Sequence, residues 1–315
     1  MYSKCPESLI RSDNVGHEPV LKHEALRLLA PKDGQKYIDC TFGGGGHSRA
    51  ILQSANCSLL AFDRDRDAAA RAEKFAAEFP GRFEFIGEPF SKLNELKTSG
   101  YAGVLMDLGV SSFQLDEAGR GFSFRSEGPI DMRMDVSRGM TALELILQTP
   151  LKELEEIIRT YGEEPRYKKA ARAIKDAAES GALSTTCDLA RAIENALGKN
   201  PRSKIHPATL TFQALRIAVN EELIEIEKAL PASFERLAQG GVLAVISFHS
   251  LEDRIVKKFF KKMAGLPEDR FDSSFVQDRV KRAELITRKP ICASEEEISR
   301  NPRSRSAKLR AIRKL

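Results

Sequence analysis

A run of four glycines, Gly43 to Gly46, stands near the start of this 315-residue chain. A short apolar stretch ending in Asp39 precedes it, and the helix-like segment 49–52 follows. Glycine lets the backbone adopt positive φ and approach a ligand closely. Between a strand and a helix N-terminus, such a loop can wrap the adenosine or phosphate part of a cofactor. The loop therefore favours a nucleotide-type site in an α/β fold, with a flexible connector as the alternative.

The spacing of these glycines differs from two common nucleotide-binding fingerprints. It is not the dinucleotide G-x-G-x-x-G pattern, and no Lys-Ser or Lys-Thr pair follows as a P-loop requires. Asp63 closes the next apolar run, sixteen residues beyond His47. A carboxylate there can accept both ribose hydroxyls of an adenosine. Methyltransferases and NAD-linked oxidoreductases share this pattern, and the missing fingerprint counts against the oxidoreductases.

Apolar runs and helix-like segments alternate through the first 107 residues. The pattern predicts strands at 37–40, 59–62, 82–86 and 102–107, with helices between them. Such alternation is typical of a parallel sheet covered by helices on both faces. Open α/β sheets place their chemistry at the carboxyl ends of strands, so Phe90 and Asp107 are candidate ligand contacts. A core position for Phe90 and a turn-capping role for Asp107 are the alternatives.

The alternation stops after Asp107 and returns at residues 241–248. Helices are expected at 151–162, 166–180 and 186–197, and a long helix from Pro207 that Pro231 stops. The sequence therefore predicts an α/β domain made of residues 1–115 and 218–315. A helical insert, residues 116–217, interrupts it.

Basic charge is concentrated towards the C-terminus. The net charge is +5, but residues 254–315 hold 18 Lys and Arg against 8 Asp and Glu, and the last sixteen residues hold seven basic side chains and no acidic one. This skew favours a polyanionic partner, because phosphate contacts dominate nucleic-acid affinity. A solvated tail without a partner is the alternative.

Three features predict a cytoplasmic protein with no membrane partner. No apolar run approaches the roughly 20 residues needed to span a bilayer. The N-terminal residues lack the apolar core of a signal peptide. The five cysteines are scattered and include no C-x-x-C pair, so we expect reduced thiols.

Eight longer motifs resemble the bacterial MraW-type family, cytosine-N4 methyltransferases of small-subunit ribosomal RNA. The resemblance runs from about residue 17 to the final Arg-Ser-Ala-Lys-Leu-Arg. So many motifs in one order are far more specific than one glycine loop. The matching stretches are His17–Leu21, Asp39–Ser48, Met106–Asp116, Gly119–Phe124, Asp131–Asp135, Ile205–Thr209, Phe212–Ile217 and Val245–Arg254.

The resemblance implies a class I, Rossmann-like fold that uses S-adenosylmethionine, with a helical substrate-recognition domain, residues 116–217, inserted after the fourth strand. It implies 16S ribosomal RNA or the small ribosomal subunit as partner, and a decoding-region cytidine as target. Its cofactor contacts carry over, residue by residue, to positions in the glycine loop and at the strand ends: Gly45, Gly46, His47, Asp63 at the ribose, Phe90 near the adenine, and Asp107 and Gln114 towards the methionine end.

Methyl transfer from a sulfonium mainly requires positioning of donor and acceptor. The exocyclic amine of cytosine is a poor nucleophile, because its lone pair is shared with the ring. A group that accepts an amine hydrogen exposes that lone pair. We therefore interpret Asp107 as the main catalytic candidate, although Asp107-Leu-Gly-Val lacks the prolines and ring of many amino-methyltransferases. His249 is a second candidate for base contact or proton handling, with a capping role as the alternative.

A target base has to leave its stack to reach a buried donor. The tail after Arg300 and several basic residues of the insert are therefore candidates for guiding RNA: Arg120, Arg125, Arg133, Lys199, Arg202 and Lys204. Residues 306–312 of this tail are also a candidate last strand. Asp131 and Asp135 favour a salt-bridged loop over a metal site, because Met-Arg-Met between them suits a hard cation poorly, and no metal is expected. The sequence leaves open a homodimer, methylation of another RNA amino group, and a non-catalytic RNA-binding assembly factor.

Overall fold

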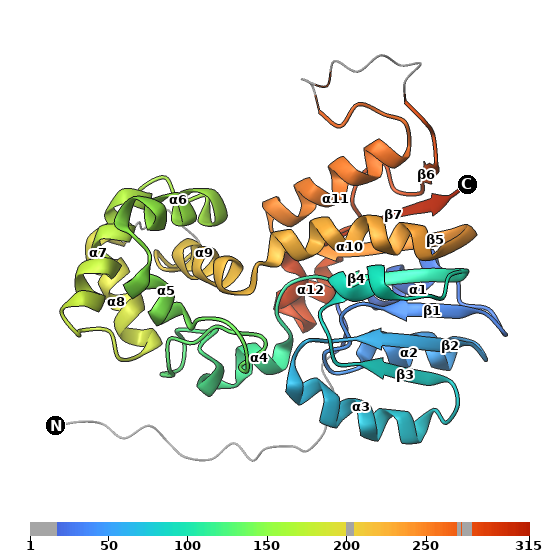
Figure 1. The fold of residues 1–315 in the computed structure, drawn as a ribbon, viewed down its shortest axis with the longest axis horizontal. Coiled ribbons are helices and arrows are strands. Elements are labelled where there is room, and N and C mark those ends of the chain that lie inside the picture. The colour runs from blue at the N-terminus through green and yellow to red at the C-terminus, as the bar shows by residue number, and fades with distance from the viewer. Residues whose placement is uncertain (1–17, 200–204, 270–271, 273–278) are drawn as a thin grey trace.

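The computed structural model of this chain describes residues 18–199, 205–269, 272 and 279–315 (Figure 1). Within these ranges the strands are β1 (Lys36–Asp39), β2 (Ser58–Phe62), β3 (Phe83–Ile86), β4 (Tyr101–Asp107), β5 (Leu237–Ser247), β6 (Ala283–Leu285) and β7 (Lys308–Lys314). They form a seven-stranded sheet in the order β3-β2-β1-β4-β5-β7-β6. Neighbours from β3 to β5 are parallel, and β7 is antiparallel to β5 and β6. The expected class I, Rossmann-like α/β fold is confirmed.

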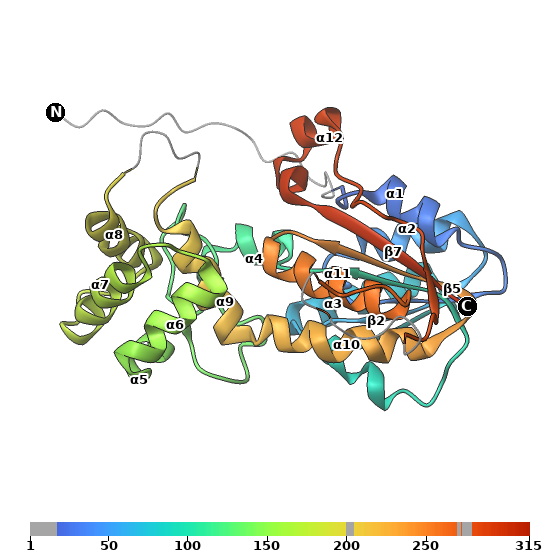
Figure 2. The same cartoon turned by 90° about the horizontal axis from the view of Figure 1, so that it is seen from above.

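Helices cover both faces of this sheet. Because side chains alternate along a strand, Tyr37 and Leu105 lie in one buried cluster, whereas Ile38 and Val104 lie in another. The first cluster includes α1 (Lys22–Leu29), α2 (Gly46–Ser54) and α3 (Arg66–Glu78). The second includes η1 (Phe90–Glu95), α10 (Glu222–Arg236) and α11 (Ser250–Met263). Figure 2 shows α1 and α2 on one side of the sheet and α10 on the other.

A separate buried cluster lies between β4 and β5 in sequence and extends from Phe122 to Leu215. Its helices stand apart from the sheet in Figure 1. The helices predicted at 151–162, 166–180 and 186–197 are confirmed. The domain boundaries stay predictions; Val219, outside the predicted insert, also packs against this cluster. No helix among the described residues combines the length and apolar character needed to cross a membrane. The helices of this region are α5 (Ala142–Gln148), α6 (Leu151–Gly162), α7 (Tyr167–Glu179), α8 (Thr186–Leu197) and α9 (Thr209–Asn220).

The single long helix predicted from Pro207 to Leu230 is wrong. α9 ends at Asn220, and Glu221 adopts φ 50° before α10 begins. Asn220 holds this break, because its Nδ2 donates to the carbonyls of Met132 at 2.7 Å and Arg216 at 2.9 Å. Pro231 does not stop the second helix but lies inside α10. The cost of its missing N–H is offset by the buried apolar side chains around it.

The basic C-terminal segment is part of the sheet, which confirms a last strand here; a contact between this segment and RNA stays a prediction. After α12 (Glu295–Arg300) and η4 (Pro302–Ser306), β7 lies between β5 and β6. Arg310 is buried and makes two bonds to Asp253, at 2.7 and 3.1 Å. Lys314 Nζ donates to three backbone carbonyls near the end of α10. Much of the charge counted in the sequence therefore serves the fold.

Candidate active site

A cavity of about 960 Å³ lies at the carboxyl ends of β1, β2, β4 and β5. Parallel strands place these ends at one edge of the sheet, so the cavity brings together segments that are distant in sequence. Six of the candidate cofactor contacts line it: Gly46, His47, Asp63, Phe90, Asp107 and Gln114. Gly45 is not among its lining residues. Its remaining wall includes Arg216, Glu222, Phe248 and Glu252.

The glycine loop is a closely packed turn. Gly45 has φ 76° and precedes the first residue of α2, a conformation that L side chains rarely adopt. A Cβ on Gly44 would lie 2.7 Å from the Phe113 ring, and one on Gly46 would lie 2.5 Å from Pro19. The loop therefore brings the N-terminus of α2 to the cavity, where its free N–H groups and dipole favour an anionic group.

Asp107 ends β4 with its carboxylate beside His47. Its N–H donates to Thr41 Oγ1 at 2.8 Å, and its Oδ2 lies 3.6 Å from His47 Nε2. Neither Asp107 Oδ1 nor His47 Nε2 has a hydrogen-bond partner among the described residues. Burial would lower the pKa of His47, but Asp107, together with the buried carboxylate of Asp39, outweighs burial and raises it. The cavity wall thus includes two side chains with buried polar atoms that have no hydrogen-bond partner among the described residues.

Asp63 is fixed at the end of β2 by backbone donors. Gly43 N–H donates to its Oδ2 at 2.7 Å, and Asp65 N–H donates to its Oδ1 at 2.9 Å. Burial raises the pKa of Asp63 to about 6, with the two N–H groups acting in the opposite direction. The carboxylate is therefore held against the glycine loop in one orientation.

Gln114 lies in α4 (Ser112–Asp116), directly after β4. Its Nε2 donates to Asp65 Oδ2 at 2.8 Å, and its Oε1 accepts from Ser111 N–H at 3.0 Å. The side chain is buried and lines the cavity. In this structure Gln114 therefore links the end of β4 to the loop that holds Asp63.

The interpretation of Arg120 as an RNA contact is wrong. Arg120 ends η2 (Ala118–Arg120) and is buried. Its Nη1 lies 3.0 Å from carboxylate oxygens of Asp65 and Asp67. Its Nη2 donates to the backbone carbonyls of Arg133 and Met134, at 3.2 and 2.8 Å. The guanidinium is therefore committed to joining the start of α3 to the following loop, and only 9% of the side chain is exposed.

We expect Arg120→Met to lower the free energy of unfolding by about 3–5 kcal/mol, because it leaves the buried Asp65 carboxylate without its cation. Arg125 is exposed, so Arg125→Met is the matched control and should change stability by no more than about 0.5 kcal/mol. Chemical denaturation of both variants measures the difference. Equal stabilities would contradict a structural role for Arg120.

The other basic candidates of the insert are distributed differently. Arg125 and Lys199 are exposed, and Lys199 Nζ lies 2.9 Å from Glu194. Arg202 and Lys204 lie outside the described residues. Arg125 and Lys199 therefore stay candidate RNA contacts on position alone.

The salt-bridged loop expected at residues 131–135 is confirmed. Arg133 Nε lies 2.8 Å from Asp131, and Arg138 Nε lies 3.4 Å from Asp135. Arg133 is thus held by its neighbour two residues away and is not a free cation for RNA. Burial would raise the pKa of Asp131, but hydrogen bonds from Arg133 outweigh it and lower the pKa below its ordinary value.

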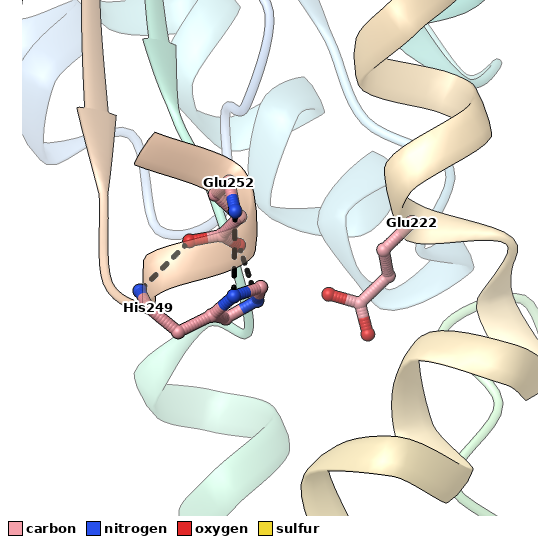
Figure 3. Close-up of side chains that lie close together, drawn as sticks. All are labelled: Glu222, His249 and Glu252. Carbon is pink, nitrogen blue, oxygen red and sulfur yellow. Dashed lines mark hydrogen bonds and ion pairs between the residues drawn. The ribbon is translucent and has the colours of Figure 1, made fainter. Parts of the chain in front are cut away.

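His249 precedes α11, where its Nδ1 accepts the Glu252 N–H at 3.4 Å. Its Nε2 lies 3.2 Å from Glu252 Oε1, but these two atoms make no well-oriented hydrogen bond. Figure 3 shows Glu222, from α10, facing this pair. Glu222 is held by Arg216, whose Nε and Nη2 donate to its two oxygens at 2.7 and 2.9 Å. His249 therefore caps the N-terminus of α11, as the alternative interpretation expected, and it does so beside the cavity.

Sequence reasoning missed Arg216, Glu222 and Glu252 as cavity residues. Arg216 and Glu252 lie in two of the motifs quoted above, but their positions in those motifs do not reveal a common site. The signal available was a charged residue inside an otherwise apolar helical face, as at Arg216. Such a residue is almost never fully buried without a partner.

Comparison with known proteins adds the family. The model of the MraW methylase family matches residues 14–315. "Ribosomal RNA small subunit methyltransferase H" of Sorangium cellulosum is 46% identical over 303 residues, which is 95% of this chain and 91% of the relative. The protein of that name from Rickettsia massiliae is 44% identical over 306 residues, covering 94% and 97% of the two chains.

The matched region contains both the sheet and the helical insert, together with every residue described at the cavity. An identity above 40% over nearly the whole of both sequences leaves little room for a different fold or a different arrangement of these segments. This chain belongs to the MraW methylase family.

Proposed function

We propose that this chain transfers a methyl group from S-adenosylmethionine to the N4 amine of a cytidine in the decoding region of 16S ribosomal RNA. Family membership and the names of the relatives support an RNA methyltransferase of the small ribosomal subunit. One observation carries the proposal: a cavity at the sheet edge is shared by the glycine loop, Asp63, Phe90 and Asp107.

S-adenosylmethionine supplies an electrophilic methyl group on a sulfonium. The cavity fits such a donor, because its volume of about 960 Å³ is lined by the glycine loop, the Asp63 carboxylate and the Phe90 ring together. Gly45, Gly46 and His47 would hold the carboxylate end at the N-terminus of α2. The Asp63 carboxylate would accept the ribose hydroxyls, and the Phe90 ring would lie against the adenine.

In the acceptor half of the reaction, Asp107 is proposed to act directly. Asp107 lines the cavity with 25% of its side chain exposed, and its buried Oδ1 has no hydrogen-bond partner among the described residues. By accepting an N4 hydrogen it would orient the amine and expose the nitrogen lone pair for in-line attack. His47, 3.6 Å from the other carboxylate oxygen, would keep Asp107 in this orientation. Gln114 would act through Asp65, as a positioning residue for the donor site.

The experiment uses small ribosomal subunits from a strain lacking this enzyme and radiolabelled S-adenosylmethionine. We expect label in the RNA, and nucleoside mass spectrometry should identify N4-methylcytidine. Label on another RNA amino group would replace the proposed target. RNA binding without any label would instead favour an assembly factor.

The raised pKa of Asp63 predicts a pH-dependent affinity for the donor. An ionised carboxylate accepts ribose hydroxyls better than a protonated one, so the donor should bind more tightly above pH about 6 and more weakly as the pH falls through about 6. Calorimetric titration of S-adenosylmethionine between pH 5 and 8 measures this. In Asp63→Asn the affinity should be weaker and nearly independent of pH over that range. A wild-type affinity that did not vary would refute the role of Asp63.

A further inference from the structure

The Arg216 guanidinium has two edges, and only one of them is committed to the protein. Nε and Nη2 donate to the two oxygens of Glu222. The opposite edge, formed by Nη1 and the second hydrogen of Nη2, donates to no group among the described residues. Arg216 lines the cavity, and 18% of its side chain is exposed. Glu222 thus orients a fork of two parallel donors at the cavity wall.

The wall around this fork is not suited to a phosphate. Glu222 and Glu252 are two buried carboxylates beside one guanidinium. Burial would raise the pKa of Glu252, but His249 and then Arg216 outweigh it and lower the pKa, so this carboxylate stays charged. An added phosphate would meet more negative than positive charge here. A neutral group with two adjacent hydrogen-bond acceptors would not be repelled by these carboxylates.

The cluster also resembles a cation site, because Glu222, His249 and Glu252 offer ligand atoms within 4.8 Å of one another. The site is empty. Both oxygens of Glu222 are already bound by the guanidinium, which would also repel a metal ion. The arrangement therefore favours an organic ligand over a cation.

The fork lies in the same cavity as the proposed acceptor carboxylate. β4 and β5 are neighbours, with Asp107 opposite Ile246 and Leu108 N–H donating to the Ile246 carbonyl at 2.9 Å. Phe248 and Glu252 follow closely after β5 and line the cavity with Asp107. A base whose amine binds Asp107 would therefore lie in the same cavity as Arg216.

We propose that Arg216, held by Glu222, binds the O2 and N3 acceptors of the target cytosine while Asp107 receives its N4 amine. This inference rests on the proposed function and adds the specificity-determining residue. Cytosine presents two adjacent acceptors beside its amine, which match a fork of two donors. Uracil keeps the O2 acceptor but presents an N3–H to the fork and a carbonyl oxygen to the carboxylate, so the contacts at N3 and at the 4-position are lost.

The test is Arg216→Lys, which keeps the charge and removes the fork. We expect kcat/KM for methylation of unmethylated small subunits to fall roughly 10- to 100-fold, and the dissociation constant for S-adenosylmethionine to change less than about twofold. Arg310→Lys is the matched control, because Arg310 makes an equivalent two-bond pair with Asp253 outside the cavity lining. It should leave kcat/KM nearly unchanged if both variants remain folded.

A second measurement reports base recognition directly. Binding is compared between RNA carrying the mapped target cytidine and the same RNA with uridine there, both with S-adenosylhomocysteine present. Wild type should prefer cytidine by roughly tenfold or more, and Arg216→Lys should lose most of that preference. Equal weakening for both RNAs would mean a backbone contact and would overturn the inference, as would a loss of donor affinity. Wild-type enzyme that methylates no cytidine would instead refute the proposed function.

Discussion

Asp107→Asn is expected to lower kcat for methyl transfer by roughly 10²- to 10⁴-fold. The carboxylate closes β4 at the cavity, where 25% of the Asp107 side chain is exposed, and it is the proposed acceptor of the amine hydrogen. An amide of the same shape keeps the fold but accepts that hydrogen less strongly and carries no charge. Single-turnover methylation of unmethylated small subunits, with saturating S-adenosylmethionine, isolates the chemical step from binding.

Asp135→Asn provides the matched control for this change. Asp135 has its own arginine partners, Arg66 and Arg138, and does not line the cavity. Its variant should retain kcat within about twofold. Donor affinity, measured by calorimetry, should change far less than kcat in Asp107→Asn. Turnover of Asp107→Asn near the wild-type rate would remove Asp107 from the mechanism.

Deletion of residues 301–315 should prevent stable folding. β7 pairs with β5 over six residue pairs, from Val242–Arg313 to Ser247–Lys308, and separates β5 from β6. Leu309 and Ile312 are fully buried, and each contributes about 1.5–3 kcal/mol. Losing them together with the strand's hydrogen bonds is comparable to the about 5–15 kcal/mol that stabilises a whole domain. Circular dichroism and calorimetry should find no cooperative unfolding transition in the truncated chain.

A point variant in the same segment separates folding from RNA binding. Arg305 is exposed in η4, so Arg305→Ser should change stability by no more than about 0.5 kcal/mol. If this segment also contacts phosphates, the salt dependence of RNA binding should decrease in Arg305→Ser. A truncated chain that unfolds cooperatively at the wild-type temperature would show that β7 is dispensable.

Much of the sheet edge could be predicted from the sequence, because it follows from local patterns. Alternating apolar runs and helices require a parallel sheet, and residues that end parallel strands meet at one edge. Asp63 and Asp107 end two such strands, and the glycine loop follows a third. The resemblance to a family added Gln114 and the nature of the donor. Neither the local patterns nor the family resemblance required knowledge of side-chain contacts.

The roles of the basic residues could not be predicted this way. Arg120 and Arg125 are both arginines of a loop without periodicity, yet one is buried between carboxylates and the other is exposed. Likewise, the basic composition of residues 300–315 favours an RNA-binding tail. In the structure, however, Arg310 faces Asp253, because β7 enters the sheet. Composition counts charges, but only the tertiary partners determine whether a charge reaches solvent.

The sequence by itself determined the fold class, the glycine turn and the carboxylates at the strand ends, since each depends on residues adjacent in the chain. The tertiary structure decided the pairing of Arg216 with Glu222. In one straight helix, residues six positions apart point in different directions, because only neighbours three or four positions apart share a face. The break at Glu221, with φ 50°, turns the two helices so that these side chains meet, and Asn220 maintains it through a contact with Met132, 88 positions away.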